Sequence, residues 1–189
     1  EIFGVMAPLV TADQRRAAKA INFGIVYGMS AFRLARELRI PRGRAADYME
    51  QYFKRYPQVV KFIEHGKETA RERGYAETMW GRRRVLHGLK AANRNEREAA
   101  ERIAINTPVQ GTAADIIKAA MIDVHRLLAD RFPSSRLILQ VHDELVLEVP
   151  TDELDAVRVA VEDAMTNVVN LNVPLIVESG DGDTWDAAH

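Results

Sequence analysis

Glycine, serine and proline divide most of this chain into segments of helical length, and this punctuation is the feature that most constrains its fold. Breaks fall at 28–30, at 40–41, at Pro57 and at Gly74. The residues between the breaks are good helix formers, and Thr11 or Asp13 can cap the first helix. We therefore predict helices over residues 11–28, 30–39, 43–56, 57–73, 95–106, 108–131 and 152–167.

Short β-rich runs occupy several of the gaps. We predict strands over residues 74–79, 136–142, 145–149 and 175–178. A turn is expected at 81–84, and Asp143-Glu144 is expected to form the tip of a hairpin. The expected fold class is α+β, with a helical front half and a smaller back half that combines helices with a small antiparallel sheet.

Composition excludes several classes of protein. The chain has 189 residues, 47% of them apolar, which is enough for a buried core. The absence of cysteine excludes a disulfide framework and a thiolate metal site, and it fits a reducing cytoplasm. No apolar stretch approaches the roughly 18 residues that a membrane span needs. We expect a cytoplasmic protein with no membrane partner. Because the chain begins with Glu1 rather than methionine, we expect a piece of a longer chain.

The formal net charge of −1 hides a strong asymmetry along the chain. Residues 143–189 contain 12 acidic residues and one basic residue, Arg158, so residues 1–142 carry a charge of +10. Such a distribution is typical of a polyanion-binding front and an acidic back. Charge alone leaves open the alternative that the basic helix faces are merely solvated.

Four residues within 11–28 recur at every fourth position, namely Arg15, Lys19, Phe23 and Tyr27. On a helix, successive members drift by only about 40°, so they form one stripe with cations followed by aromatic rings. Such a face can hold a phosphate tail and stack a base. The spacing alone also fits aromatic residues that face a core with cations beside them. Gly28, which follows the stripe, permits a close approach or a hinge.

The segment from Arg15 to Gly28 closely resembles the motif that opens the fingers helix of family A DNA polymerases, the bacterial DNA polymerase I type. The family pattern is Arg, three residues, Lys, three residues, Phe or Tyr, then three residues to Tyr-Gly, and every fixed position is filled. The resemblance implies that Arg15 and Lys19 grip a nucleoside triphosphate and that Lys19 can protonate the leaving pyrophosphate. It also implies that Phe23 packs against the incoming nucleotide, and that Tyr27 and Gly28 lie where the templating base enters.

The acidic turn carries a second resemblance. Carboxylates on a rigid turn are hard oxygen ligands suited to Mg²⁺, although a solvated acidic turn has the same composition. Residues 141–144 resemble the His-Asp-Glu palm motif of the same family. The resemblance implies that Asp143 binds metal and is catalytic and that Glu144 has a secondary catalytic role. It further implies that His142 touches the primer end.

Further segments resemble parts of the family that contact DNA. Residues 108–115 resemble the segment whose glutamine, here Gln110, lies along the primer–template minor groove. Arg102 and Asn106 resemble residues that contact the template strand, and Arg84 resembles the last arginine of a basic turn that approaches DNA. Phosphate contacts of this kind carry affinity without sequence information.

The resemblance covers practically the whole chain, but one palm motif has no counterpart. The family's Asp-Tyr-Ser-Gln-Ile-Glu-Leu-Arg segment, which lies upstream of the fingers helix, resembles nothing in residues 1–189. It supplies the second metal-binding aspartate and the glutamate that excludes ribonucleotides. We therefore expect the fingers subdomain, mainly residues 1–94, and part of the palm, residues 95–189, of a larger polymerase.

The implied function is template-directed DNA synthesis, with two Mg²⁺ ions in the intact enzyme. The implied partners are primer–template DNA, deoxynucleoside triphosphates, and the upstream thumb and remaining palm of the same polypeptide. The chain alone is expected to be inactive. Two other classes stay open, a nucleic-acid-binding module without turnover and a metal-dependent nuclease, which would leave the stripe on residues 15–27 without a role.

Overall fold

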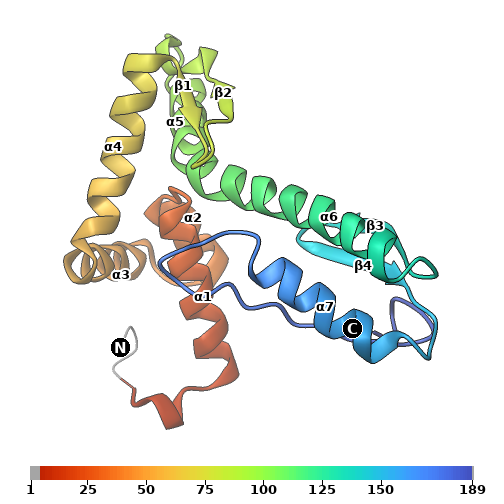
Figure 1. The fold of residues 1–189 in the computed structure, drawn as a ribbon. Coiled ribbons are helices and arrows are strands. Elements are labelled where there is room, and N and C mark those ends of the chain that lie inside the picture. Colours follow the sequence, from red (N-terminus) through yellow and green to blue (C-terminus); the bar gives the residue numbers. More distant parts are fainter. Residues whose placement is uncertain (1–4, 189) are drawn as a thin grey trace. The chain divides into compact units, whose positions relative to one another are not determined.

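The computed structural model describes residues 5–188 and divides the chain into two compact units, which meet in sequence between Gly111 and Thr112. Unit 1 contains η1 (Ala7–Leu9), α1 (Ala12–Val26), α2 (Ala31–Leu38), α3 (Arg42–Arg55), α4 (Pro57–Arg73), β1 (Tyr75–Glu77), β2 (Arg83–Val85), η2 (His87–Lys90), α5 (Arg94–Asn106) and η3 (Thr107–Gly111) (Figure 1). Unit 2 contains α6 (Thr112–Arg131), β3 (Arg136–Val141), β4 (Glu144–Glu148) and α7 (Leu154–Thr166). The predicted α+β class is confirmed.

Local sequence signals set the ends of the helices in unit 1. The Thr11 hydroxyl accepts the backbone N–H of Gln14 at 3.2 Å, and the Gln14 side chain accepts the backbone N–H of Thr11 at 3.0 Å, which is a capping box. Pro57 occupies the first turn of α4, where its missing N–H has no helical partner. Gly74 ends that helix in the left-handed conformation, with φ of 78°.

The first three long helices of unit 1 share one apolar core. Its buried residues are Ile21, Ile25, Leu34, Ala35, Ala45 and Tyr52. The Tyr52 hydroxyl donates a 2.7 Å hydrogen bond to Asn22 Oδ1, which ties α3 to α1. Burial, and secondly the neighbouring Tyr56, raises the pKa of Tyr52 above its usual value. This core fixes which face of α1 is left to solvent.

A second apolar cluster joins α4, β1, η2 and α5, and it contains Ala70, Ala76, Leu86, Leu89, Ala100 and Ala104. β1 pairs antiparallel with β2. The predicted turn at 81–84 is wrong in its position, because Arg83 and Arg84 belong to β2 and the turn lies at 79–80. Thr78 holds this turn closer to β1 than predicted, because its hydroxyl accepts hydrogen bonds from the backbone N–H groups of Trp80 and Arg82.

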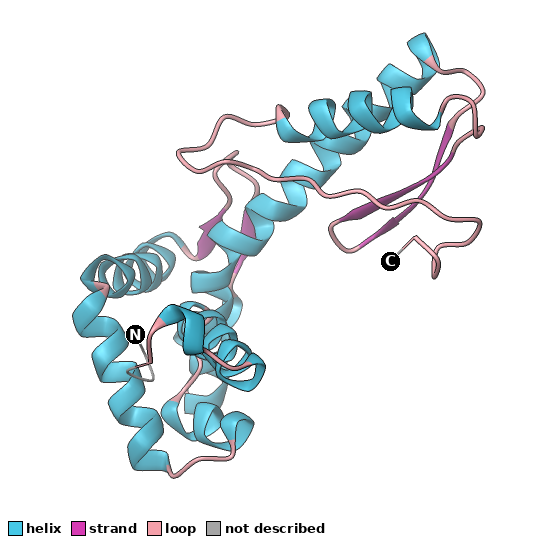
Figure 2. Ribbon diagram, turned by 90° about the horizontal axis from the view of Figure 1, so that it is seen from below, coloured by secondary structure: helices cyan, strands magenta, loops and turns pink. Residues whose placement is uncertain are grey.

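Unit 2 packs its hairpin and α7 against α6. The shared core includes Val124, Leu128, Phe132, Val157 and Val161, with Leu137, Leu145 and Leu147 of the hairpin packed against it. β3 and β4 pair antiparallel, with an irregularity between Leu137 and Leu139 (Figure 2). Ser135 Oγ donates a 2.8 Å hydrogen bond to Glu153 Oε2, which fixes the loop before α7.

One predicted element of the back half is wrong, and another, the helix predicted over 108–131, is confirmed with a different start. Residues 175–178 form no strand, because no strand in the part of the chain that the structure describes pairs with them. The C-terminal segment is instead tied to α7 by contacts of Ser179 with Glu162 and of Arg158 with Asp181. The helix predicted over 108–131 begins as a π-helical turn, η3, before α6. Pro108 has no N–H to donate to the preceding helical turn, which disfavours regular α-helix there.

The compact units divide at a different place from the predicted subdomains. The predicted boundary lies at 94–95, whereas α5 packs on α4 and η2 and so belongs to unit 1. The assignment of fingers and palm to parts of the chain stays a prediction. Among the described residues, no helix combines the length and the apolar composition that crossing a lipid bilayer requires.

Candidate nucleic-acid interface

The predicted stripe lies on α1 and is open to solvent at its cationic end. Arg15 and Lys19 are exposed, and neither forms an ion pair with a described residue. Phe23 is 52% exposed. The rings of Phe23 and Tyr27 are stacked, with centroids 6.1 Å apart and planes at 19°. The stripe therefore presents two uncompensated cations followed by a pair of nearly parallel aromatic rings.

The opposite face of α1 explains why the stripe is free. Ile21, Gly24 and Ile25 are buried in the α1–α3 core. Because one face of α1 is buried, the opposite face, which carries the stripe, is left to solvent. The alternative in which the aromatic residues of the stripe pack into a core is therefore excluded for Phe23. The structure thus brings the four predicted residues onto one accessible surface.

Gly28 follows the aromatic end of the stripe and lies close to α5. Its φ is +75°, a conformation that side-chain-bearing residues rarely adopt. A Cβ at this position would also lie 3.4 Å from Arg102 Cγ and from Ile105 Cδ1. The backbone conformation therefore favours glycine here, and the side chains of Arg102 and Ile105 pack close to it. The contact places two of the predicted DNA-binding residues, Gly28 and Arg102, next to each other.

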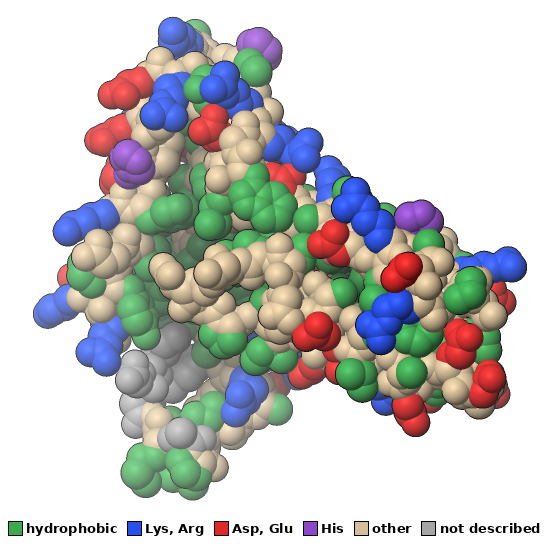
Figure 3. Space-filling model, in the orientation of Figure 1, with side chains coloured by type: hydrophobic (Ala, Val, Ile, Leu, Met, Phe, Trp, Pro, Cys, Tyr) green, Lys and Arg blue, Asp and Glu red, His purple; other side chains and the backbone are tan. Residues whose placement is uncertain are grey.

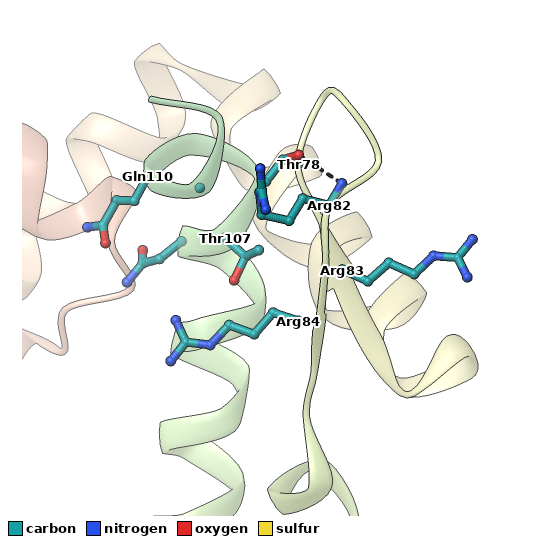
Figure 4. A pocket seen from close by; sticks show the side chains of 8 residues that line it. Thr78, Arg82, Arg83, Arg84, Thr107 and Gln110 are labelled. Carbon is teal, nitrogen blue, oxygen red and sulfur yellow. Dashed lines mark hydrogen bonds between the residues drawn. The ribbon is translucent and has the colours of Figure 1, made fainter. Parts of the chain in front are cut away.

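A separate pocket of about 140 Å³ in unit 1 gathers three other predicted residues. It is lined by Thr78, Arg82, Arg83, Arg84, Asn106, Thr107, Gln110 and Gly111. The arginines come from the turn and strand β2, whereas Asn106 ends α5 and Gln110 lies in η3. In Figure 4, Arg82 and Arg84 extend toward the side of Thr107 and Gln110, and Arg83 extends away from it. Arg84, Asn106 and Gln110 were predicted from separate segments, and the fold brings them together.

One polar atom that lines this pocket has no partner, whereas Arg83 is engaged within the protein. Asn106 Oδ1 is buried and has no hydrogen-bond partner within the described structure. An unpaired buried carbonyl oxygen costs roughly 1–3 kcal/mol, which a donor from a bound molecule would offset. Arg83, by contrast, donates from Nε to Glu77 Oε2 at 3.0 Å, and this hydrogen bond raises the pKa of Arg83. Its guanidinium also lies 4.7 Å from the centre of the Tyr75 ring, so Arg83 is engaged within the protein.

Sequence reasoning missed the residues that shape this pocket. Thr78 is buried, and its hydroxyl holds the turn that precedes the arginines. Gly111 allows η3 to approach, because a Cβ there would lie only 2.7 Å from Thr78 Cγ2. Thr107 donates its hydroxyl to the Ile103 carbonyl at 2.7 Å. A glycine inside a predicted helix was the available signal for this close approach.

The acidic turn lies in unit 2 and differs in detail from the prediction. His142 and Asp143 form the tip, while Glu144 is the first residue of β4, opposite Val141. The pairing of Val141 with Glu144 leaves room for only two residues between the strands. His142 has a φ of +55°, an uncommon conformation for a residue with a side chain, and its carbonyl accepts a 2.8 Å hydrogen bond from Gln140 Nε2. Asp143 is exposed at the tip.

The carboxylates of Asp143, at the tip, and Glu144, at the start of β4, fit Mg²⁺ by chemistry, because both are hard oxygen donors. Nowhere in residues 5–188 do three His, Asp or Glu side chains come close enough together to hold a metal ion.

Comparison with known proteins identifies relatives over the whole chain. The family model described as DNA polymerase family A matches residues 1–187. DNA polymerase I of Pseudomonas aeruginosa is 49% identical over 189 residues, which is 100% of this chain and 21% of that protein. The thermostable DNA polymerase I of Thermus aquaticus is 49% identical over 187 residues, 99% of this chain and 22% of that protein.

A solved structure is similar as well. The POL domain of Pol1 from M. smegmatis, in complex with DNA primer-template and dNTP, matches with a TM-score of 0.94 and 46% identity. The match covers 99% of this chain and 33% of that one. The chain spans about a fifth of the length of the curated relatives it matches. The family-model match, together with the motif on α1, shows that the chain belongs to DNA polymerase family A.

Proposed function

We propose that this chain forms the fingers and part of the palm of a DNA-directed DNA polymerase, which adds deoxynucleotides to the 3′-hydroxyl of a primer. The observation that carries the proposal is the solvent-facing stripe on α1, with two unpaired cations followed by two stacked rings. Membership of family A supports it, as do the names of the relatives and the DNA and dNTP in the similar solved structure.

The cationic end of the stripe binds the triphosphate of the incoming nucleotide. Arg15 offers a planar fork of donors that matches phosphate oxygens, and Lys19 offers a mobile ammonium. One helical turn separates them, so both reach the same polyphosphate. Lys19 also carries a proton that it can donate to the leaving pyrophosphate. Neither cation must first break an ion pair with another described residue.

The aromatic end of the stripe positions the base pair that is being formed. Phe23 packs against the incoming nucleotide, and Tyr27 occupies or leaves the position of the templating base. Gly28, with its positive φ, ends this segment and serves as a pivot for α1. Movement of the helix between two positions would test the shape of the base pair before the reaction.

The pocket lined by Arg82, Arg83 and Arg84, which we call the arginine pocket, contacts the primer–template duplex behind the site of synthesis. Arg84 meets a backbone phosphate, and Gln110 with Asn106 lies along the minor groove of the primer–template. The unpaired Asn106 Oδ1 accepts a hydrogen bond there. Arg102, which Gly28 contacts, reaches the template strand. These contacts read shape and charge rather than sequence, as a general DNA polymerase requires.

The hairpin tip holds part of the catalytic metal site. Asp143 is the residue of this chain that would bind Mg²⁺, Glu144 beside it has a secondary role, and His142 lies at the primer end. When bound, two Mg²⁺ ions stabilise the charge that develops on the transferred phosphoryl group. The second aspartate comes from an upstream palm segment, so the chain alone is inactive. The upstream palm and thumb are partners within the same polypeptide, which works in the cytoplasm.

The role of the stripe can be tested in a polymerase chain that also carries the upstream palm segment. Substituting Arg15→Gln or Lys19→Gln should lower kcat/KM for deoxynucleotides by at least about tenfold, because each removes a charge-assisted phosphate contact. Arg16→Gln is the matched control, since Arg16 lies next to the stripe and pairs with Asp13 at 3.4 Å. An equal effect of all three substitutions would refute the assignment.

A further inference from the structure

A second pocket in unit 1 has no role in the proposed function. It lies between α4, β1 and the junction of α5 with η3, and we call it the α4 pocket. Its volume is about 250 Å³. Pockets that hold small organic molecules begin at roughly 300 Å³, so the α4 pocket has the size for a compact ligand. It is separate from the arginine pocket, although Thr78 lines both.

The floor of the α4 pocket is apolar. Its hydrophobic lining consists of Phe62, Ala70, Ala76, Ala104 and Pro108. The three alanines are buried, and their small side chains leave space that larger ones would fill. Phe62 is 38% exposed, so its ring offers a surface on which another ring can pack. Figure 3 shows hydrophobic side chains gathered where α4 faces the rest of unit 1, with basic side chains along the outer edge of that helix.

Gly66 keeps one wall of the α4 pocket open. It lies in the middle of α4, where glycine costs about 1 kcal/mol relative to alanine. Packing does not demand this glycine, because a Cβ there would come no closer than 4.0 Å to Ala104 O and Ile105 Cα. Its backbone is not in the left-handed region either. The missing side chain therefore adds to the space inside the pocket without another structural reason.

Polar side chains line the pocket along one side of α4. His65, Thr69 and Arg73 recur at every fourth position, so they follow one another along the helix over about 12 Å. Neither His65 nor Arg73 forms an ion pair with a described residue. The one carboxylate of the lining, Glu77, is already held by Arg83 at 3.0 Å. The pocket therefore presents one uncompensated guanidinium beside an apolar floor.

We propose that the α4 pocket binds a small organic anion with an aromatic body. The carboxylate or sulfonate of such a molecule accepts charge-assisted hydrogen bonds from Arg73, and its ring packs against Phe62 and the alanine floor. A bare phosphate would gain nothing from the apolar floor, and a neutral ring would leave Arg73 without its partner. One cation beside one apolar cavity matches a molecule with one anionic group and one ring system.

Two fluorescent probes that differ in a single group test the proposal. Anilinonaphthalene sulfonate has the chemistry of the proposed ligand, and phenylnaphthylamine is the same molecule without the sulfonate. Each probe is titrated into a polymerase chain that also carries the upstream palm, and into its variants Arg73→Gln and Gly66→Leu. Arg36→Gln is the matched control, because Arg36 is also an exposed arginine of unit 1 that forms no ion pair with a described residue.

Arg73→Gln should weaken binding of the sulfonate by about fivefold and leave binding of the neutral probe nearly unchanged. Gly66→Leu should weaken both probes by about tenfold, because its side chain fills the pocket. Arg36→Gln should bind both probes as the parent does. Far-ultraviolet circular dichroism checks that each variant is folded, and the Arg73→Gln comparison decides alone if Gly66→Leu is not.

Three results would overturn the inference. The first is an Arg73→Gln variant that keeps the parent's affinity for the sulfonate or loses both probes equally. The second is a folded Gly66→Leu variant that binds both probes as tightly as the parent. The third is an equal loss of sulfonate binding in Arg36→Gln and Arg73→Gln, since this would mean that the probe responds to the general charge of unit 1.

Discussion

Gly111→Ala should destabilise unit 1, because the new methyl group would overlap the side chain of Thr78. Its Cβ would lie 2.7 Å from Thr78 Cγ2, whereas carbon atoms in contact are normally about 3.5–4.0 Å apart. Thr78 cannot turn away at low cost. It is 6% exposed, and its hydroxyl accepts backbone N–H groups from Trp80 at 3.3 Å and Arg82 at 3.1 Å.

The size of the effect follows from these contacts. Overpacking costs about 1–3 kcal/mol, and rotating Thr78 would instead give up two hydrogen bonds worth about 1 kcal/mol each. The greater helix propensity of alanine offsets up to about 1 kcal/mol. We expect Gly111→Ala to lower the free energy of unfolding by about 1–2 kcal/mol. Gly43→Ala is the matched control, because a Cβ on that helical glycine would meet no atom within 4 Å, and we expect it to leave stability unchanged or slightly higher.

Urea unfolding of the chain can measure both variants. The chain has two tryptophans, so Trp185→Phe leaves Trp80, which lies beside Thr78, as the single fluorescent reporter. Adding Thr78→Ser removes Cγ2 but keeps the hydroxyl, and it should restore about 1 kcal/mol to Gly111→Ala. The account of the contact is refuted if Gly111→Ala matches Gly43→Ala in stability, or if Thr78→Ser gives no rescue.

Three further predictions concern single side chains. In the intact polymerase, Phe23→Tyr should increase incorporation of dideoxynucleotides, because the added hydroxyl offers a polar group near the sugar; equal incorporation by both forms in a sequencing-type assay would reject this. Asp143→Ala should reduce primer extension to background while gel-shift binding of primer–template persists, and residual extension near the parent rate would remove Asp143 from the metal site. Tyr52→Phe should cost about 1 kcal/mol through loss of the hydrogen bond to Asn22. Since the pKa of Tyr52 is raised in the folded chain, deprotonation opposes folding, so stability is lost as pH rises through and above about 10 in the parent. Tyr52→Phe should show a smaller alkaline loss in urea titrations at several pH values.

Local signals predicted the helices well because their ends are set by neighbouring residues. The Thr11 capping box, Pro57 and Gly74 act within a few residues, so the sequence around them is sufficient. Elements that need a distant partner were less predictable. The run at 175–178 has the composition of a strand, but a strand forms only where another strand accepts its hydrogen bonds.

The residues of the candidate site also differ in how far the sequence alone could predict them. The stripe from Arg15 to Tyr27 lies within one helix, so its spacing was enough to predict a shared face. The arginine pocket depends on the approach of η3 to the β1–β2 turn, through Gly111 and Thr78, which are far apart in sequence. Resemblance to the family suggested Arg84 and Gln110 separately, but only the fold places both beside the unpaired Asn106.

The central claim is that this chain holds a nucleotide-binding helix and one part of a divided metal site. The most direct measurement is Mg²⁺-dependent primer extension by the 189-residue chain, beside a longer chain that restores the upstream aspartate segment. We predict extension by the longer chain alone. Extension by the 189-residue chain would contradict the account, because it would mean that other carboxylates of this chain complete the site around Asp143.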